Sequence, residues 1–157
     1  MQDLFLDYVI VVNGAATIDL TGLPSNVQVV RRGNACYDGG TAGEVLASMD
    51  IRAYHFFLIM NSSVRGPFLP AYFPQSTGMS TTRWTTAFTD LLTEKIKLVG
   101  TTISCERRVH VQSMLLATDR VGLGILQESG ALDCAKNRDE AIINYELGAS
   151  AAIMGKG

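Results

Sequence analysis

His110 and Gln112 are the first side chains whose type and spacing suggest chemistry. They lie two residues apart in a predicted strand, so both side chains project from one face of it. Polar groups inside an otherwise apolar strand must find hydrogen-bond partners or line a cavity. We interpret them as a substrate-facing pair; the alternative is a core histidine bonded to the backbone.

A polar turn, Asn61-Ser-Ser-Val-Arg-Gly-Pro67, directly follows the most apolar stretch of the chain, His55-Phe-Phe-Leu-Ile-Met60. The amide and hydroxyl oxygens at the start of this turn are weaker ligands for Mg²⁺ or Mn²⁺ than carboxylates are. Arg65 is placed to take part of the negative charge of a bound diphosphate instead. The alternative is a structural turn that closes the strand through its Asn side chain.

Asp38 is the carboxylate of a glycine-rich segment, Gly33-Asn-Ala-Cys-Tyr-Asp-Gly-Gly40. Glycines beside it allow the backbone to approach a ligand closely. The segment therefore predicts a ligand-contacting turn, with an ordinary turn aspartate as the alternative. Trp84 is a further candidate, because an indole ring can stack on a sugar, although packing in the core is the more common use of tryptophan.

The elements that must position these residues alternate along the chain. Apolar segments predict strands at 8–12, 27–31, 55–60, 97–104 and 109–117. Helical spacing and capping residues predict helices at 41–49, 84–95, about 119–128 and 139–154. The alternation predicts an α/β domain with a doubly wound, mostly parallel sheet, in which 55–60 is a central strand with parallel neighbours. Ligands bind such sheets beyond the carboxyl ends of the strands, where both polar turns would lie.

Composition narrows the class of protein. Hydrophobic residues make up 47% of the 157 residues and charged residues 18%, which is typical of a globular domain. The net charge of −2 gives no electrostatic reason to expect a nucleic-acid partner. Three cysteines without CxxC spacing argue against a disulfide framework and against a zinc site, and so predict a reducing compartment. The sequence contains no apolar run long enough to span a bilayer, no P-loop, no GxGxxG fingerprint and no GxSxG elbow.

Four blocks in order give the chain a resemblance to a known family. They are the glycine-rich segment 33–40, the run 54–70 that contains the polar turn, His110-Val-Gln-Ser113 with Ala117-Thr-Asp-Arg120, and Tyr145-Glu-Leu-Gly-Ala-Ser150. Together they resemble the polysaccharide-building glycosyltransferases of the rhamnan-synthesis type and their algal and bacterial relatives. The resemblance implies a GT-A fold, a nucleotide-sugar donor, a glycan acceptor, inverting transfer of a hexose or deoxyhexose, and usually Mn²⁺ or Mg²⁺.

The resemblance also implies roles for individual residues. Asn61, Ser62 and Ser63 stand where a DxD motif would hold the metal, so Asn61 and Ser63 are at most weak ligands and we expect little Mn²⁺ binding. Asp38 would contact the nucleoside or ribose of the donor. Glu146 would be the base that deprotonates the acceptor hydroxyl; the alternative is a surface glutamate. We expect the apolar face of its helix, Ile142, Ile143 and Leu147, to face the sheet.

The first predicted strand, Tyr8–Val12, ends in Asn13-Gly14 as the second strand of the family does. We therefore expect residues 1–157 to form one glycosyltransferase-like domain that is a fragment lacking the first β-α unit, with an exposed apolar sheet edge near that strand. We expect the protein to be located in the cytoplasm or on the cytoplasmic face of a membrane system. The alternative location is the Golgi lumen, if a preceding segment carries a signal. The alternative function is a non-catalytic nucleotide-sugar-binding or scaffold module of the same fold.

Overall fold

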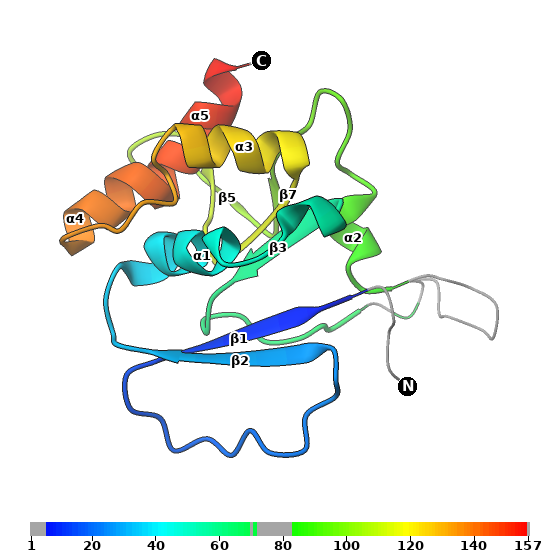
Figure 1. Cartoon of the computed structure of the whole chain (residues 1–157). Helices are drawn as coiled ribbons and strands as arrows, with labels where there is room; N and C mark the ends of the chain where they lie inside the picture. Colours follow the sequence, from blue (N-terminus) through cyan, green and yellow to red (C-terminus); the bar gives the residue numbers. More distant parts are fainter. Residues whose placement is uncertain (1–5, 70, 72–82, 157) are drawn as a thin grey trace.

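The computed structural model describes residues 6–69, 71 and 83–156. In Figure 1 the first two strands lie at one end of the molecule and the C-terminal helices at the other, with α1 between them. The elements in chain order are β1 (Tyr8–Asn13), β2 (Val27–Arg32), α1 (Tyr37–Ala47), η1 (Ile51–Ala53), β3 (Phe56–Met60), α2 (Thr86–Thr89), β4 (Val99–Gly100), β5 (Ile103–Ser104), β6 (His110–Val111), β7 (Leu115–Asp119), α3 (Arg120–Glu128), α4 (Arg138–Ala141), η2 (Ile142–Leu147) and α5 (Gly148–Gly155).

The strands form three small sheets in the described part of the chain, and this corrects the predicted fold. β1 and β2 pair in parallel and form a two-stranded sheet. β3 and β4 both pair antiparallel with β7, in the order β3-β7-β4, and β5 pairs antiparallel with β6. The prediction of a doubly wound, mostly parallel GT-A-like sheet is therefore wrong. β3 is not the centre of a parallel sheet, because among the described residues it pairs with one strand, the antiparallel β7.

The physical reason for this error is that apolar patterning reports burial and not strand direction. Leu115–Thr118 is fully buried in β7, as a central parallel strand would be, but it pairs with antiparallel neighbours. Two predicted long strands are also broken. The segment 97–104 contains the two-residue strands β4 and β5, and 109–117 contains β6 and the start of β7.

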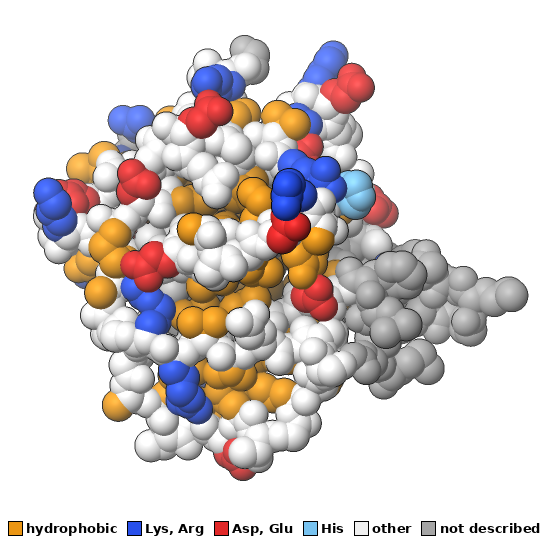
Figure 2. Space-filling view, viewed as in Figure 1, with side chains coloured by type: hydrophobic (Ala, Val, Ile, Leu, Met, Phe, Trp, Pro, Cys, Tyr) orange, Lys and Arg blue, Asp and Glu red, His pale blue; other side chains and the backbone are white. Residues whose placement is uncertain are grey.

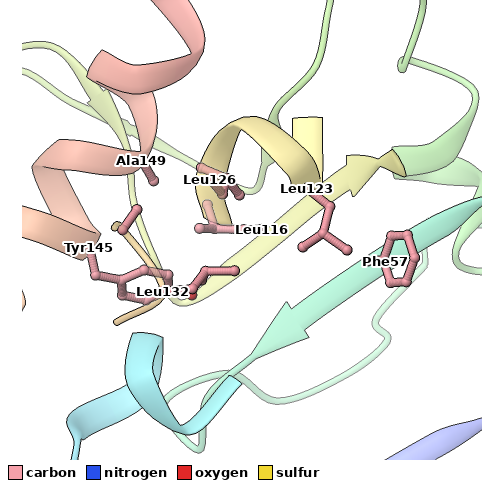
Figure 3. Close-up of a cluster of buried hydrophobic side chains, with 8 residues drawn as sticks. Phe57, Leu116, Leu123, Leu126, Leu132, Tyr145 and Ala149 are labelled. Carbon is pink, nitrogen blue, oxygen red and sulfur yellow. The ribbon is translucent and has the colours of Figure 1, made fainter. Parts of the chain in front are cut away.

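The core lies between the β3–β7 pair and the helices that follow it (Figure 3). Its side chains come from β3, β7, α3, the loop after α3 and the continuous run of α4, η2 and α5 at 138–155, called here the C-terminal helical segment. They are Phe57, Leu116, Leu123, Leu126, Ala131, Leu132, Tyr145 and Ala149. Burying each large aliphatic side chain of this kind contributes roughly 1.5–3 kcal/mol to folding. Thr118 is also fully buried, and its hydroxyl donates a hydrogen bond to the carbonyl of Lys97 at 2.7 Å.

Two helix starts show how well capping residues predict boundaries. α3 begins as expected, because the Asp119 side chain accepts a hydrogen bond from the Gly122 amide at 2.8 Å. α1 begins at Tyr37 and not at Thr41, so the second half of the glycine-rich segment is helix and not turn. The predicted helix at 84–95 is reduced to the single turn of α2.

The glycines of α1 serve close packing of the helix against other parts of the chain. A Cβ on Gly40 would lie 2.7 Å from the Cα of Cys134, and one on Gly43 would collide with the carbonyl oxygen of Leu132. At this contact Cys36 and Cys134, 98 residues apart, form a disulfide. The expectation that the cysteines form no disulfide is therefore wrong, because spacing along the chain says nothing about a pair that the fold brings together. Cys105 is free and exposed.

None of the helices within the described ranges combines the length and apolar character needed to cross a membrane.

Candidate functional site

Two adjoining cavities lie beside α1 and bring together residues from several predicted motifs. The larger has a volume of about 330 Å³ and lies between β1, β3 and α1. The smaller has a volume of about 150 Å³ and lies between the start of α1 and the C-terminal helical segment. Asp38, Ser113 and Tyr145 line both, so they mark the junction of the two cavities.

The β1 wall of the larger cavity is a strand edge without a strand partner among the described residues. The amide of Tyr8 donates to the carbonyl of Asn26, just before β2, and the amide of Gly14 donates to the carbonyl of Arg32, at 2.8 Å each. Because hydrogen-bonding direction alternates along a strand, the backbone groups of Val9, Val11 and Asn13 point away from β2. These three residues line the cavity.

The β3 wall of the larger cavity is likewise a strand edge without a strand partner among the described residues. The Asn61 amide donates to the carbonyl of Met114 at 3.1 Å, on the β7 side. By the same alternation, the backbone groups of Phe56, Leu58 and Met60 point away from β7, and these residues also line the cavity. The larger cavity therefore lies beside two strand edges, β1 and β3, that have no strand partner on this side among the described residues, and apolar side chains of both strands line it.

A hydrogen-bonded polar pair, formed by the residues just before β1 and β3, lies at one end of the larger cavity. The Tyr54 hydroxyl donates a hydrogen bond of 2.6 Å to Oδ2 of Asp7, and this bond raises the pKa of the tyrosine. Hydrophobic side chains remain visible on the face shown in Figure 2, around α1 and the β1–β2 pair, so this part of the molecule is incompletely covered.

At the other end of the cavity, the two motif segments meet. Nδ2 of Asn61 donates a hydrogen bond of 3.0 Å to Oδ2 of Asp38, and Oδ1 of Asn61 accepts one of 2.9 Å from the Ser63 amide. Asp38, Asn61 and Ser62 line the larger cavity. The turn at 61–63 is therefore closed through its Asn side chain, as the structural alternative predicted, and it also lies at a cavity.

Backbone strain precedes Asp38. Cys36 and Tyr37 both have positive φ angles, 68° and 51°, a conformation that side chains with a Cβ rarely adopt. Such residues persist where the surrounding structure holds them, and they occur often at functional sites. Here the disulfide fixes Cys36, and Arg32 donates hydrogen bonds of 3.0 Å to the Ala35 carbonyl and 2.8 Å to the Thr41 hydroxyl. Asp38 then lies in the first turn of α1, where the helix dipole favours a carboxylate.

The smaller cavity is lined by charged side chains of both signs. Glu146 and Arg138 line it together with Asp38. Arg138 is the one cationic side chain among the residues that line either cavity. Glu146 belongs to η2, a π-helical segment between α4 and α5, and π-helical turns are rare and often mark functional sites.

Tyr145 is the most unusual residue of the site. It is 4% exposed, and its hydroxyl is buried without a hydrogen-bond partner in the described part of the chain. Burial raises the pKa of this phenol, and the negative charges of Asp38 and Glu146 raise it further. Its ring packs on the backbone of α1, since a Cβ on Gly39 would lie 2.6 Å from the ring carbon Cγ. Figure 3 shows the ring directed from the C-terminal helical segment toward Leu132.

Several predicted site residues lie elsewhere. His110 is buried, and its Nδ1 is 2.8 Å from the carbonyl oxygen of Arg108, as in the core interpretation. The side-chain oxygen of Gln112 accepts a hydrogen bond of 2.6 Å from the Thr102 hydroxyl. His110, Gln112, Ser63 and Arg65 do not line the two cavities. Trp84 is half-buried and packs edge-on against Phe88.

The donor set does not fit a strong divalent metal site. Oδ1 of Asn61 is already engaged with the Ser63 amide, and no carboxylate lies within 61–63. Mg²⁺ and Mn²⁺ favour carboxylate ligands. Among the described residues, the one cluster of Cys, His, Asp and Glu atoms close enough to share an ion is Cys36, Glu44 and Cys134, and its sulfur atoms are joined in the disulfide. Weak Mn²⁺ binding stays a prediction for calorimetry.

Sequence reasoning missed Tyr145, Arg138 and Ser113 as site residues. The helical period placed Ile143 on the buried face, but it is 57% exposed while Tyr145 is buried. The π-helical turn changes the number of residues per turn and so changes which side chains face inward. Ser113 belongs to the His110-Val-Gln-Ser113 block, but it lies outside the alternating pair His110 and Gln112 that the strand pattern singles out.

Comparison with known proteins adds no relative to this description. No family model, no curated protein and no solved structure matches the chain.

Proposed function

We propose that this chain is a glycosyltransferase-type domain that binds a nucleotide-sugar in the two cavities and transfers a hexose or deoxyhexose, with inversion, to a glycan acceptor. The observation that carries the proposal is the Asp38–Asn61 hydrogen bond at the edge of the larger cavity. It joins two of the four blocks that resemble the rhamnan-synthesis-type enzymes. A third block, through Tyr145 and Glu146, lines the adjoining cavity.

The larger cavity suits the nucleoside. Its volume of about 330 Å³ falls within the range of roughly 300–1,000 Å³ usual for small-molecule pockets. A nucleobase is flat, with apolar faces and a polar rim. The apolar side chains and the open edges of β1 and β3 provide complementary groups for both. Asp38, at the end of this cavity, would accept hydrogen bonds from ribose hydroxyls.

The smaller cavity suits the reacting groups. Arg138 supplies a positive charge for the diphosphate, whose charge must be neutralised as it leaves. Glu146 is exposed and lines the same cavity, as a base that removes the acceptor proton must. Arg138 takes the role that the sequence suggested for Arg65.

A non-catalytic nucleotide-sugar-binding module is the second candidate. The absence of a carboxylate within 61–63 favours it, because a transferase of this type usually relies on a metal held there. Transfer of sugar in an assay separates the two candidates, since the module would bind the donor and release it unchanged.

The disulfide points to an oxidising compartment. Disulfides persist in secretory compartments and outside the cell and are rare in the reducing cytosol. The Cys36–Cys134 bond therefore supports a lumenal or extracellular domain in place of the cytoplasmic location expected from cysteine spacing.

A thermal-shift screen of nucleotides and nucleotide-sugars, with and without Mn²⁺, tests the proposal. A ligand at 100 times its dissociation constant should stabilise the chain by about 2.7 kcal/mol. Asp38→Asn should weaken the shift, and Asp90→Asn, an exposed aspartate that lines neither cavity, serves as the matched control. A panel in which no nucleotide or nucleotide-sugar raises the unfolding temperature would contradict the proposal.

Catalysis has its own test. Glu146→Gln keeps the size of the side chain and removes the base, so donor binding should persist while turnover falls about 10²–10⁴-fold. The measurement is transfer from the donor that the screen selects to a glycan acceptor. Unchanged turnover would exclude Glu146 as the base.

A further inference from the structure

The proposed function leaves unexplained the two strand edges that flank the larger cavity. β1 pairs with β2 and β3 pairs with β7, and neither strand has a second partner among the described residues. Proteins usually cover, charge or shorten such edges, because an open edge is a template for another strand. Here both open edges border one cavity, and the space between them is the strand slot. The outward residues that line it are Val9, Val11, Asn13, Phe56, Leu58 and Met60.

Two observations bracket the distance between the two edges. β1 and β3 are too far apart to pair with each other. Just before the two strands, however, the Tyr54 hydroxyl and the Asp7 carboxylate form a hydrogen bond of 2.6 Å. Since paired strands lie about 4.8 Å apart, a gap of two strands would separate the edges by roughly 14 Å, beyond the combined reach of a tyrosine and an aspartate side chain. At this end the gap therefore has the width of one strand.

The lining of the strand slot restricts the chemistry of its occupant. The α1 residues that line it are apolar at four positions, Ala42, Val45, Leu46 and Met49. Its charged lining residues are Asp7 at one end and Asp38 at the other, and no Lys, Arg or His of the described ranges lines it. Because successive side chains of a strand alternate between two faces, an occupant with apolar residues at alternate positions would pack against α1. A basic residue at each end would face a carboxylate.

We propose that the strand slot binds one extended segment of a partner polypeptide, which adds a strand between β1 and β3. Backbone hydrogen bonds to the two edges supply affinity, and the alternating apolar side chains and basic ends supply specificity. A polypeptide is the ligand that carries donors and acceptors on both sides at the spacing of a strand. This inference goes beyond the proposed function. The segment occupies the space that the proposed function assigns to the nucleoside, so the two ligands exclude each other.

The probe is the synthetic peptide acetyl-Lys-Val-Thr-Val-Thr-Val-Lys-amide, with binding measured by calorimetry. A version that is N-methylated at two central residues loses two hydrogen-bond donors and should bind at least about 10-fold more weakly. A version with Glu in place of both Lys residues should also bind more weakly, because Asp7 and Asp38 repel it.

Ala42→Arg and Ala47→Arg are matched variants of the protein. Both alanines belong to α1, but Ala42 is half-buried and lines the strand slot, whereas Ala47 is exposed and lines neither cavity. Ala42→Arg places a large side chain in the slot and should lower the affinity for the peptide at least about 10-fold. Ala47→Arg should bind the peptide as the parent does.

Amide hydrogen exchange followed by NMR locates the peptide without any substitution. The amides of Val9, Val11 and Leu58 point away from their strand partners, so the added strand should slow their exchange. The amides of Ile10 and Ile59 point toward β2 and β7, and their exchange should change little. These inward amides are the internal control of the experiment.

The outcomes separate this inference from the proposed function. Failure of the peptide to bind, equal affinity of the N-methylated peptide, or binding that leaves the outward amides unprotected would overturn the strand slot. None of these results bears on the thermal-shift screen. Peptide binding to a chain that binds no nucleotide or nucleotide-sugar would support the slot and end the proposed function. If both ligands bind, the peptide should displace the nucleotide-sugar, and simultaneous binding would overturn the slot as placed here.

Discussion

The β1–β2 pair and the β3–β7 pair contain similarly apolar strands but differ in how they are held. Phe57 of β3 and Leu116 of β7 lie in the core, covered by α3 and the C-terminal helical segment. In β1 and β2, Val12 is the single buried residue. The free edge of β1 faces a cavity, and polar contacts such as Tyr54–Asp7 and the Arg32–Glu44 ion pair connect the pair to the rest.

This difference shows that an apolar strand contributes to stability only as far as a second layer covers it. Burial of apolar area, and not apolar composition, supplies the stabilising free energy. The cavity beside β1 is the place where that second layer is incomplete, and the candidate ligand site lies in the same place. The two regions are connected through α1, whose Thr41 and Glu44 contact Arg32 of β2 and whose start is bonded to Cys134.

Removing the disulfide should have the largest effect on this arrangement. Replacing Cys36 and Cys134 by Ser opens a loop of 98 residues, and the free energy of unfolding should fall by roughly 4–5 kcal/mol. Urea denaturation of parent and variant measures the difference. Cys105→Ser is the control, because this cysteine is free and exposed. A double variant within about 1 kcal/mol of the parent would show that packing alone holds α1 in place.

Two matched truncations compare the strand pairs directly. Leu116→Ala and Ile10→Ala each remove three carbon atoms, but Leu116 is 1% exposed whereas Ile10 is half-buried at the open sheet. Leu116→Ala should lower the free energy of unfolding by about 2–5 kcal/mol. Ile10→Ala should lower it by about 1 kcal/mol. Equal losses would mean that β1 is packed as well as β7, which would contradict the difference between the two strand pairs.

The pH dependence of stability should reveal the buried phenol at the junction. The pKa of Tyr145 is raised by burial and by Asp38 and Glu146, so the folded protein keeps this proton at a pH where the unfolded chain releases it. The free energy of unfolding should therefore be unaffected by this group below about pH 10 and fall by about 1.4 kcal/mol per pH unit above it. Urea denaturation across that range should show a shallower fall for Tyr145→Phe. The same slope in both proteins would contradict the assigned burial.

Local rules in the sequence predicted the positions of several elements but not how the strands pair, and long-range contacts account for most of what they missed. β1, β2 and β3 begin and end within one or two residues of expectation, and α3, which Asp119 caps, begins within one residue of it. Strand direction, the Cys36–Cys134 bond and the π-helical turn depend on contacts between distant segments or on non-standard helix geometry. No periodicity in the sequence encodes these features.

The candidate site was predictable to a similar extent. Asp38, Asn61, Ser62 and Glu146 were identified by residue type and motif order, and the structure brings them to adjoining cavities. His110 and Gln112 satisfy their polar groups within the protein, an outcome that the strand pattern allowed but could not select. Tyr145 was hidden because an aromatic residue in a helix is usually read as core, and only the unpaired hydroxyl distinguishes it.

The location of ligand binding tests the central claim most directly. Amide hydrogen exchange of the chain should be compared with and without the nucleotide-sugar that gives the largest thermal shift. Our account predicts slower exchange at the start of α1, in the turn at 61–63 and in η2, three segments that contribute residues to the two cavities. Binding accompanied by protection confined to other segments, such as the β5–β6 hairpin or α3, would contradict it.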